Sequence, residues 1–253
     1  MTAPAPAEAP TAGASTGAAV LEARGLVREY GPVLAVDGID LSLDAGEFLT
    51  VFGPNGAGKS SLLGMLAGAM RPTRGEVLVR GTPMSWSDGE WRSRVGIVSH
   101  RGFLYGRLTA AENLRFYGRL FGVDDLDHRV TEGLARVRLS ERANFQARQL
   151  SHGMRQRLSL ARALLHDPDV VLLDEPYTGL DPSAAGVLRG VLTELRDGRR
   201  TVVMVTHHLK EGLELATRVA IQVAGRFAWE GSTGGIDRGD FERHYHAVVE
   251  GGS

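Results

Sequence analysis

Short apolar runs separated by glycine-containing turns fill the first hundred residues, and the same pattern returns after residue 169. Apolar and polar positions alternate over 21–30 and 39–43, which predicts two antiparallel strands followed by a turn at Asp44-Ala45-Gly46. Mainly apolar runs predict the remaining strands, at 48–52, 76–80, 95–99, 170–173, 201–206 and 219–223. Because several of these runs are apolar on both faces, we expect an α/β fold with a mostly parallel sheet covered by helices.

The apolar spacing becomes helical in two regions of the chain. Leucines follow a helical period over 60–69, directly after a glycine-rich stretch. Farther on, a capping box at Thr109 opens a helix whose apolar stripe is Leu114, Tyr117 and Phe121, and 125–137 predicts a second helix. We therefore expect an α-helical lobe, about residues 104–165, inserted into the α/β core.

The two ends of the chain differ from the middle in composition. Residues 1–19 are rich in Ala, Pro, Thr and Gly and lack the basic start and apolar core of a signal peptide, so we expect a disordered tail. Residues 236–253 are mainly polar and are expected to be a C-terminal tail. One domain should then span 20–235, with the helical lobe inside it.

Charge and composition exclude several classes of protein. The net charge of −1 gives no electrostatic attraction to nucleic acid or anionic lipid, so we expect no nucleic-acid partner. There are no cysteines, which removes disulfides and cysteine-based metal sites. No apolar run approaches the roughly 20 residues that cross a bilayer, so a membrane role would come through a partner.

A phosphate-binding loop is the first motif with chemistry. It fits G-x-x-x-x-G-K-[ST], follows a predicted strand and opens a predicted helix, which is the context this motif requires. Its residues are Gly53, Pro54, Asn55, Gly56, Ala57, Gly58, Lys59 and Ser60, with Ser61 next along the helix. Backbone N–H groups would surround the phosphates of a nucleotide, Lys59 would neutralise them, and the Ser60 hydroxyl would bind Mg²⁺. Lys59 is one of two lysines in an arginine-rich chain, which fits the need for a compact point charge.

Two acids follow the predicted strand at 170–173. Asp174 and Glu175 would lie at the carboxyl edge of the parallel sheet, where ligands bind. Asp174 is suited to the Mg²⁺ shell, and Glu175 is placed to orient or deprotonate an attacking water. Together with the phosphate loop, this pair predicts a nucleotide hydrolase.

The stretch Leu150-Ser-His-Gly-Met154, followed by Arg-Gln-Arg157 and a helix through Ala163, resembles the signature motif of ATP-binding-cassette (ABC) ATPases. Asp174-Glu175-Pro176, Thr178-Gly-Leu-Asp181 and His207 continue the motif order of that family, and the similarity covers about 21–230. The resemblance implies a P-loop NTPase fold with an ABC-ATPase core, an antiparallel β subdomain and an inserted α-helical lobe.

In this family two cassettes stack head to tail around two ATP molecules. The resemblance therefore implies that Ser151, His152 and Gly153 contact the ATP held by a second subunit. His207 would be the switch histidine, acting in catalysis with Glu175. Tyr30 would stack on adenine, and Asp181 would belong to the turn that links the two sites.

The same resemblance implies the partners and the location. The chain would hydrolyse ATP with Mg²⁺, pair as a homodimer, and drive an integral membrane transporter subunit from the cytoplasmic face of the cell membrane. A loop at Leu104-Tyr105 would dock a cytoplasmic helix of that subunit, while the stripe after Thr109 would mostly belong to the core.

The chain departs from the family pattern at His100 and within the signature motif. His100 stands where a Mg²⁺-contacting glutamine is usual, and the signature carries His152 and Met154 where glycine and glutamine are common. Our hypothesis is that His100 contacts the metal, senses the nucleotide and makes turnover depend on pH between about 5.5 and 7.

A finer resemblance concerns the cargo. The run from Ser99 to Tyr117 is similar to the ATP-binding subunit of bacterial haem exporters used in cytochrome c maturation. An exporter of a drug, lipid or ion remains an alternative, as does a soluble ABC ATPase in DNA repair or translation. A GTPase would need Asn-Lys-x-Asp, and neither lysine follows an asparagine.

Overall fold

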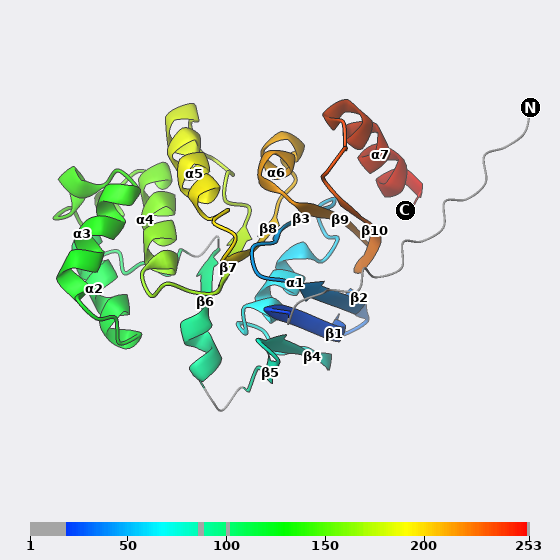
Figure 1. The fold of residues 1–253 in the computed structure, drawn as a ribbon, viewed down its shortest axis with the longest axis horizontal. Helices are drawn as coiled ribbons and strands as arrows, with labels where there is room; N and C mark the ends of the chain where they lie inside the picture. Colours follow the sequence, from blue (N-terminus) through cyan, green and yellow to red (C-terminus); the bar gives the residue numbers. More distant parts are fainter. Residues whose placement is uncertain (1–18, 86–88, 100–101, 252–253) are drawn as a thin grey trace, which may run out of the picture.

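The computed structural model describes residues 19–85, 89–99 and 102–251 (Figure 1). Residues 1–18 of the tail expected at 1–19, and the predicted site residue His100, lie outside the described residues. Two sheets, with helices between and around them, form the α/β core, and a group of helices extends from one side of it. Within the described ranges, every helix is too short or too polar to cross a membrane.

A six-stranded sheet forms the centre of the fold, in the order β10-β9-β3-β8-β7-β6. Its strands are β3 (Phe48–Phe52), β6 (Val95–Val98), β7 (Val170–Asp174), β8 (Thr201–Val205), β9 (Arg218–Val223) and β10 (Arg226–Ser232). All neighbouring pairs are parallel except β9 and β10, which form an antiparallel hairpin at one edge. The predicted mostly parallel sheet is confirmed.

A smaller antiparallel sheet lies beside the first, in the order β2-β1-β4-β5. Its strands are β1 (Leu21–Tyr30), β2 (Val33–Leu43), β4 (Arg74–Val79) and β5 (Thr82–Pro83). β2 begins six residues before the predicted strand at 39–43, because it stays paired with β1 through several register shifts. Alternation is blurred at such irregularities, so the sequence revealed only the regular half of this strand.

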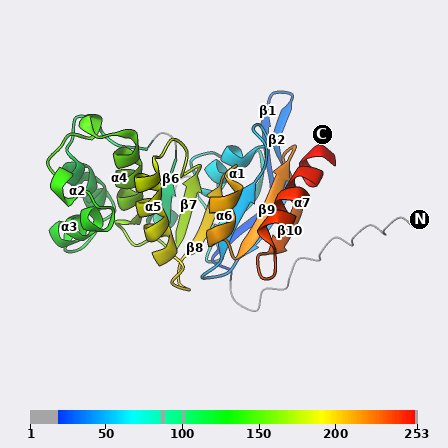
Figure 2. The ribbon, with the colours of Figure 1, turned by 90° about the horizontal axis from the view of Figure 1, so that it is seen from above.

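Helices cover both faces of the central sheet (Figures 1 and 2). Helix α1 (Lys59–Leu66) packs between the two sheets, whereas α5 (Pro182–Glu194), α6 (Leu209–Leu215) and α7 (Arg238–Gly251) lie on the opposite face. Alternate residues of one strand therefore belong to different cores: in β8, Val203 and Val205 pack with α1, and Val202 and Met204 pack with α5. This explains why the strands have no polar face.

The helical lobe consists of α2 (Ala110–Leu120), α3 (Leu126–Arg136) and α4 (His152–Leu164). Short 3-10 turns occur at Glu90–Arg94, Ser140–Arg142 and Ala147–Gln149. The predicted capping box opens α2: the Glu112 N–H donates to Thr109 Oγ1 at 3.1 Å, and the Thr109 N–H donates to Glu112 Oε2 at 2.8 Å. Asn113, fully buried, ties the preceding loop to the helix by donating to the carbonyl oxygens of Tyr105 and Leu108.

Residues 238–251, expected to belong to a C-terminal tail, form helix α7 instead. Phe241 is 2% exposed and its ring lies 5.3 Å from that of Phe52. Tyr245, Val248 and Val249 pack around the same cluster, and their spacing from Phe241 is helical. The apolar stripe is narrow and interrupted by histidines and charged residues, which made the segment look like a polar tail.

Candidate nucleotide-binding site

The predicted phosphate loop joins β3 to α1 at the carboxyl edge of the central sheet. Gly58 caps α1 with a φ of 99°, and a Cβ at this position would lie 1.9 Å from the carbonyl oxygen of Ala35 on β2. A Cβ on Gly53 would lie 2.2 Å from the carbonyl oxygen of Gln222 on β9. Since both obstacles are backbone atoms in strands, neither can move aside, and only glycine fits.

The base of the loop is fixed and its tip is open. Ala57 is buried, its N–H donates to the Pro54 carbonyl at 3.2 Å, and its carbonyl accepts from the Gly225 N–H at 3.0 Å. Asn55 and Gly56 are exposed at the tip, and Ser61 is half-buried in the first turn of α1. The loop therefore has a rigid frame on which backbone N–H groups remain available to a ligand.

Lys59 is buried within this loop, with 7% of its surface exposed. Its ammonium group donates to the carbonyl oxygens of Gly53 at 2.7 Å and Pro54 at 2.9 Å. Burial lowers the pKa of Lys59 below its usual value, and the nearby carboxylates of Glu175 and Asp174 oppose that shift. The lysine thus places a positive charge where both acids act on it.

Ser60 and Asp174 meet across the gap between α1 and β7. The Ser60 hydroxyl donates to Asp174 Oδ1 at 3.2 Å, and Asp174, at the last position of β7, is 7% exposed. A hydroxyl and a carboxylate are hard oxygen donors, which suit Mg²⁺. The pair predicted as metal ligands is therefore brought together by the fold.

Glu175 is held in one orientation by three donors from the chain after β8. Its Oε2 accepts from Thr206 Oγ1 at 3.0 Å and from the His207 N–H at 3.4 Å, and its Oε1 lies 2.9 Å from His207 Nδ1. The Glu175 side chain is 11% exposed, whereas that of His207 is 49% exposed. The carboxylate is thus sheltered and the imidazole faces outward beside it.

The start of α4 and the turn before α5 form a second group, within the same chain. Ser151 caps α4 by accepting from the Met154 N–H at 3.2 Å, and Asp181 caps α5 by accepting from the Ala184 N–H at 2.8 Å. His152 Nε2 lies 3.2 Å from the carbonyl oxygen of Thr178. Among the described residues, no hydrogen bond joins this group to the phosphate loop.

Tyr30 lies at the end of β1 and is 43% exposed. Its hydroxyl donates to Met70 Sδ at 2.9 Å, and the guanidinium of Arg28 lies 4.6 Å from its ring centroid. The ring is therefore held in place while it remains open to a stacking partner.

Three residues near this site were missing from the sequence-based prediction. Thr206 is fully buried and binds Glu175, and His208 packs its ring 4.2 Å from that of His207. Gln222 is fully buried under the phosphate loop. Their positions at the ends of strands β8 and β9 were the available signal, because such ends meet at one edge of a parallel sheet.

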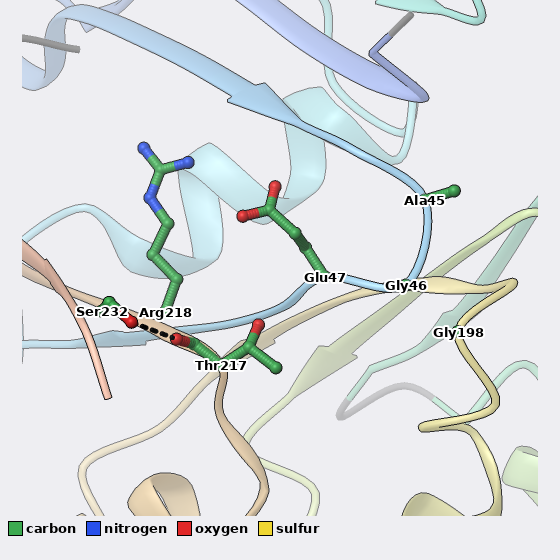
Figure 3. Close-up of a pocket in the computed structure, with 7 residues that line it drawn as sticks. All are labelled: Ala45, Gly46, Glu47, Gly198, Thr217, Arg218 and Ser232. Carbon is green, nitrogen blue, oxygen red and sulfur yellow. Dashed lines mark hydrogen bonds between the residues drawn. The ribbon is translucent and has the colours of Figure 1, made fainter. Parts of the chain in front are cut away.

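A pocket of about 430 Å³ lies elsewhere in the molecule (Figure 3). It is at the amino-terminal edge of the central sheet and is lined by residues that precede or begin strands, or that lie near β10: Ala45, Gly46, Glu47, Gly198, Thr217, Arg218 and Ser232. Arg218 is already paired with Glu230 at 2.6 Å. Ligands of parallel α/β sheets bind at the other edge, and this pocket contains none of the predicted site residues.

Known proteins with similar sequences include ATP-binding proteins of transporters. The chain is 39% identical over 215 residues to the Nod factor export ATP-binding protein I of Cupriavidus metallidurans, covering 84% of this chain and 71% of that protein. It is 33% identical to the ABC transporter ATP-binding protein NatA of Bacillus subtilis, covering 79% of this chain and 82% of that protein. These names do not support the haem-export resemblance.

Solved structures of ATP-binding cassettes have the same fold as this chain. A dimeric post-hydrolysis state of the ATP-binding cassette MJ0796 bound to ADP and Pi superposes with a TM-score of 0.78 and 26% identity, covering 85% of this chain and 100% of that chain. The family described as ABC transporter matches residues 36–178. With the phosphate loop, Asp174 and Glu175 gathered at one edge of the sheet, the chain belongs to the ABC transporter family and is an ATP-hydrolysing cassette of it.

Proposed function

We propose that this cassette is the ATP-hydrolysing subunit of an export-type ABC transporter, and that it works as a homodimer at the cytoplasmic face of the membrane. The observation that supports the catalytic part best is the sheltered Glu175 carboxylate. It is oriented by Thr206 and His207 and lies next to the buried charge of Lys59.

ATP would bind with its phosphates in the loop at 53–60 and its adenine on the exposed face of Tyr30. Lys59 would exchange its present bonds to the carbonyl oxygens of Gly53 and Pro54 for the β- and γ-phosphates. The Ser60 hydroxyl and the Asp174 carboxylate would hold Mg²⁺, which neutralises charge on the phosphate oxygens when bound. The metal role of His100 stays a prediction of the sequence.

Glu175 and His207 would carry out hydrolysis. Glu175 would accept the proton of a water as its oxygen attacks the γ-phosphorus, and the bond to the ADP oxygen would break. His207, whose ring is half exposed beside that carboxylate, would contact the γ-phosphate and keep the water in line. Thr206 would hold Glu175 in position for this step.

A second subunit would complete each site. Ser151, His152 and Gly153 lie at the amino end of α4, where free N–H groups favour an anion. Dimeric structures of MJ0796 support a paired arrangement. Asp181, which caps the helix beside this group, would report the state of one site to the other.

The membrane partner would dock on the lobe. An apolar depression of about 710 Å³ lies along α2, lined by Leu108, Glu112, Arg115, Phe116, Arg119 and Leu120. Leu120 is 67% exposed, and Tyr105 is 50% exposed with its ring 4.8 Å from that of Phe116. Leu114 of the predicted stripe is fully buried, as expected for core packing, so the docking residues would be Tyr105, Phe116 and Leu120.

The identity of the transported cargo would be determined by the membrane partner. Names of the relatives favour an exporter, as in Nod factor export, and haem is the second candidate, on the resemblance of 99–117 alone. Co-purification of this chain from detergent-solubilised membranes, followed by identification of the bound membrane protein, distinguishes the two cargoes. Recovery of a soluble DNA- or ribosome-associated partner instead would support the soluble ABC ATPase alternative.

Glu175→Gln tests the proposed mechanism. Glutamine keeps the shape and the bonds from Thr206 and His207 while losing the proton acceptor, so we expect ATP binding to persist and turnover to fall by at least about 100-fold. ATP should then trap a dimer visible by size-exclusion chromatography. Exposed Glu194→Gln is the matched control, and full hydrolysis by Glu175→Gln would remove Glu175 from its role.

A further inference from the structure

Three side chains of types that can bind a metal ion converge after strands β7 and β8. Glu175, His207 and His208 each offer a ligand atom, a carboxylate oxygen or a ring nitrogen, and these atoms lie within 4.8 Å of one another. Within the described ranges, this is the one group of three such residues found together. The ATPase mechanism proposed above uses Glu175 and His207 and assigns no role to His208.

His208 carries an unsatisfied nitrogen. Its Nε2 is buried and has no hydrogen-bond partner among the residues that the structure describes. Its ring is fixed by packing at 4.2 Å from the ring of His207, and its N–H donates to Thr206 Oγ1 at 3.1 Å. A buried polar atom without a partner costs free energy, so a ligand that used this nitrogen would recover it.

We propose that Glu175, His207 and His208 form a binding site for a divalent transition metal, represented by Zn²⁺, and that its occupation inhibits ATP hydrolysis. Two imidazoles and one carboxylate are a ligand set that suits Zn²⁺ and does not suit Mg²⁺, which prefers oxygen. The site is therefore distinct from the oxygen pair of Ser60 and Asp174, which is suited to Mg²⁺.

The geometry needs only small side-chain movements. Zn²⁺ bonds of about 2.0–2.2 Å place two tetrahedral ligands roughly 3.3 Å apart. His207 Nδ1 and Glu175 Oε1 are 2.9 Å apart, so a metal would replace their hydrogen bond and widen the pair slightly. The 49% exposed side chain of His207 has room to turn, and the group as a whole must close from within 4.8 Å.

Local charge also favours a divalent cation. The carboxylates of Asp174 and Glu175 both act on the ammonium of Lys59, so these three side chains together carry one negative charge. The inhibitory consequence rests on the proposed function, because a metal on Glu175 and His207 occupies the proton acceptor and the switch histidine together. The binding itself does not depend on that function.

Metal binding is measured on the full, nucleotide-free chain by competition with a chromophoric Zn²⁺ chelator. His208→Phe is the informative variant, since it keeps a flat ring beside His207 but removes both nitrogens, and His208→Ala is the second variant. We expect at least about a tenfold loss of Zn²⁺ affinity in both. His246→Ala, an exposed histidine on α7, is the matched control and should bind as the wild type does.

ATP hydrolysis with saturating Mg²⁺-ATP and increasing Zn²⁺ gives the second readout. Wild type and His246→Ala should be inhibited, and His208→Phe should need at least about ten times more Zn²⁺ for the same inhibition. Equal Zn²⁺ affinity and equal inhibition in wild type and His208→Phe would overturn the proposal. That result is expected if Zn²⁺ inhibits only by binding ATP. If Glu175→Gln still hydrolyses ATP while Zn²⁺ binding depends on His208, the metal site stands and the catalytic assignment fails.

Discussion

Thr206→Val tests how the fold orients the Glu175 carboxylate. The Thr206 hydroxyl is fully buried, donates to Glu175 Oε2 at 3.0 Å and accepts from the His208 N–H at 3.1 Å. Valine keeps the shape of the side chain but supplies neither bond. A hydrogen bond to a charged group contributes about 1.5–3 kcal/mol and a neutral one about 0.5–1.5 kcal/mol, so we expect the free energy of unfolding to fall by about 2–4.5 kcal/mol.

Turnover should fall as well, since Glu175 loses one of the donors that fix it. If the bond acts fully in the transition state, the loss corresponds to about a 10- to 100-fold decrease in kcat. The assays are steady-state ATP hydrolysis and urea unfolding, with Thr206→Ser as the control that retains the hydroxyl. A folded Thr206→Val protein that hydrolyses ATP at the wild-type rate would refute the orienting role.

Two further predictions concern stability. Phe241→Ala should lower the free energy of unfolding, measured in urea, by about 3–5 kcal/mol, because Phe241 is 2% exposed. The control Glu242→Ala, at an exposed position of the same helix, should change it little. Equal stability of the two variants would show that the packing of α7 does not stabilise the fold. Burial lowers the pKa of His166 below its ordinary value of 6.5. As the pH drops from 7 to 5, the unfolded chain therefore binds a proton at His166 more readily than the folded chain does, and the free energy of unfolding falls. His166→Phe, which retains the stacking on Phe121 at 4.1 Å, should lose less stability over the same range in urea unfolding; an equal loss would assign the effect to other groups.

Elements with a regular pattern were predictable from the sequence, and irregular ones were not. β3 matches its predicted bounds because its apolar run is uninterrupted, and β1 matches its bounds although its pairing with β2 shifts register after Ala23. β2 was half missed at its register shifts, and α7 was taken for a tail because one aromatic, Phe241, provides most of its burial. The spacing of apolar residues predicts a regular strand or helix that packs along its whole length. It predicts poorly a helix that packs on the core through only a few side chains.

For the site, local motifs were readable and contacts between distant segments were not. The phosphate loop and Asp174-Glu175 are contiguous in the chain, so their spacing alone indicated nucleotide chemistry. Thr206, His208 and Gln222 are ordinary residues at strand ends, and only the parallel arrangement of β7, β8 and β9 brings them to the site. The carbonyl of Ala35 that forces glycine at position 58 is likewise a tertiary contact.

The strand order has a consequence for how the protein is made. β3, which carries the phosphate loop, lies between β8 and β9, and its first N–H is bonded to the Thr217 hydroxyl, 169 positions later in the chain. Strand pairs between such distant segments form late in folding, because closing the long loop between them costs conformational entropy. During synthesis the loop that would hold ATP therefore leaves the ribosome long before the strands that give it shape. Until β8 is made, both edges of the apolar strand β3 are unpaired, and one edge stays unpaired until β9 is complete. The nascent chain therefore depends on rapid completion or a chaperone to avoid aggregation.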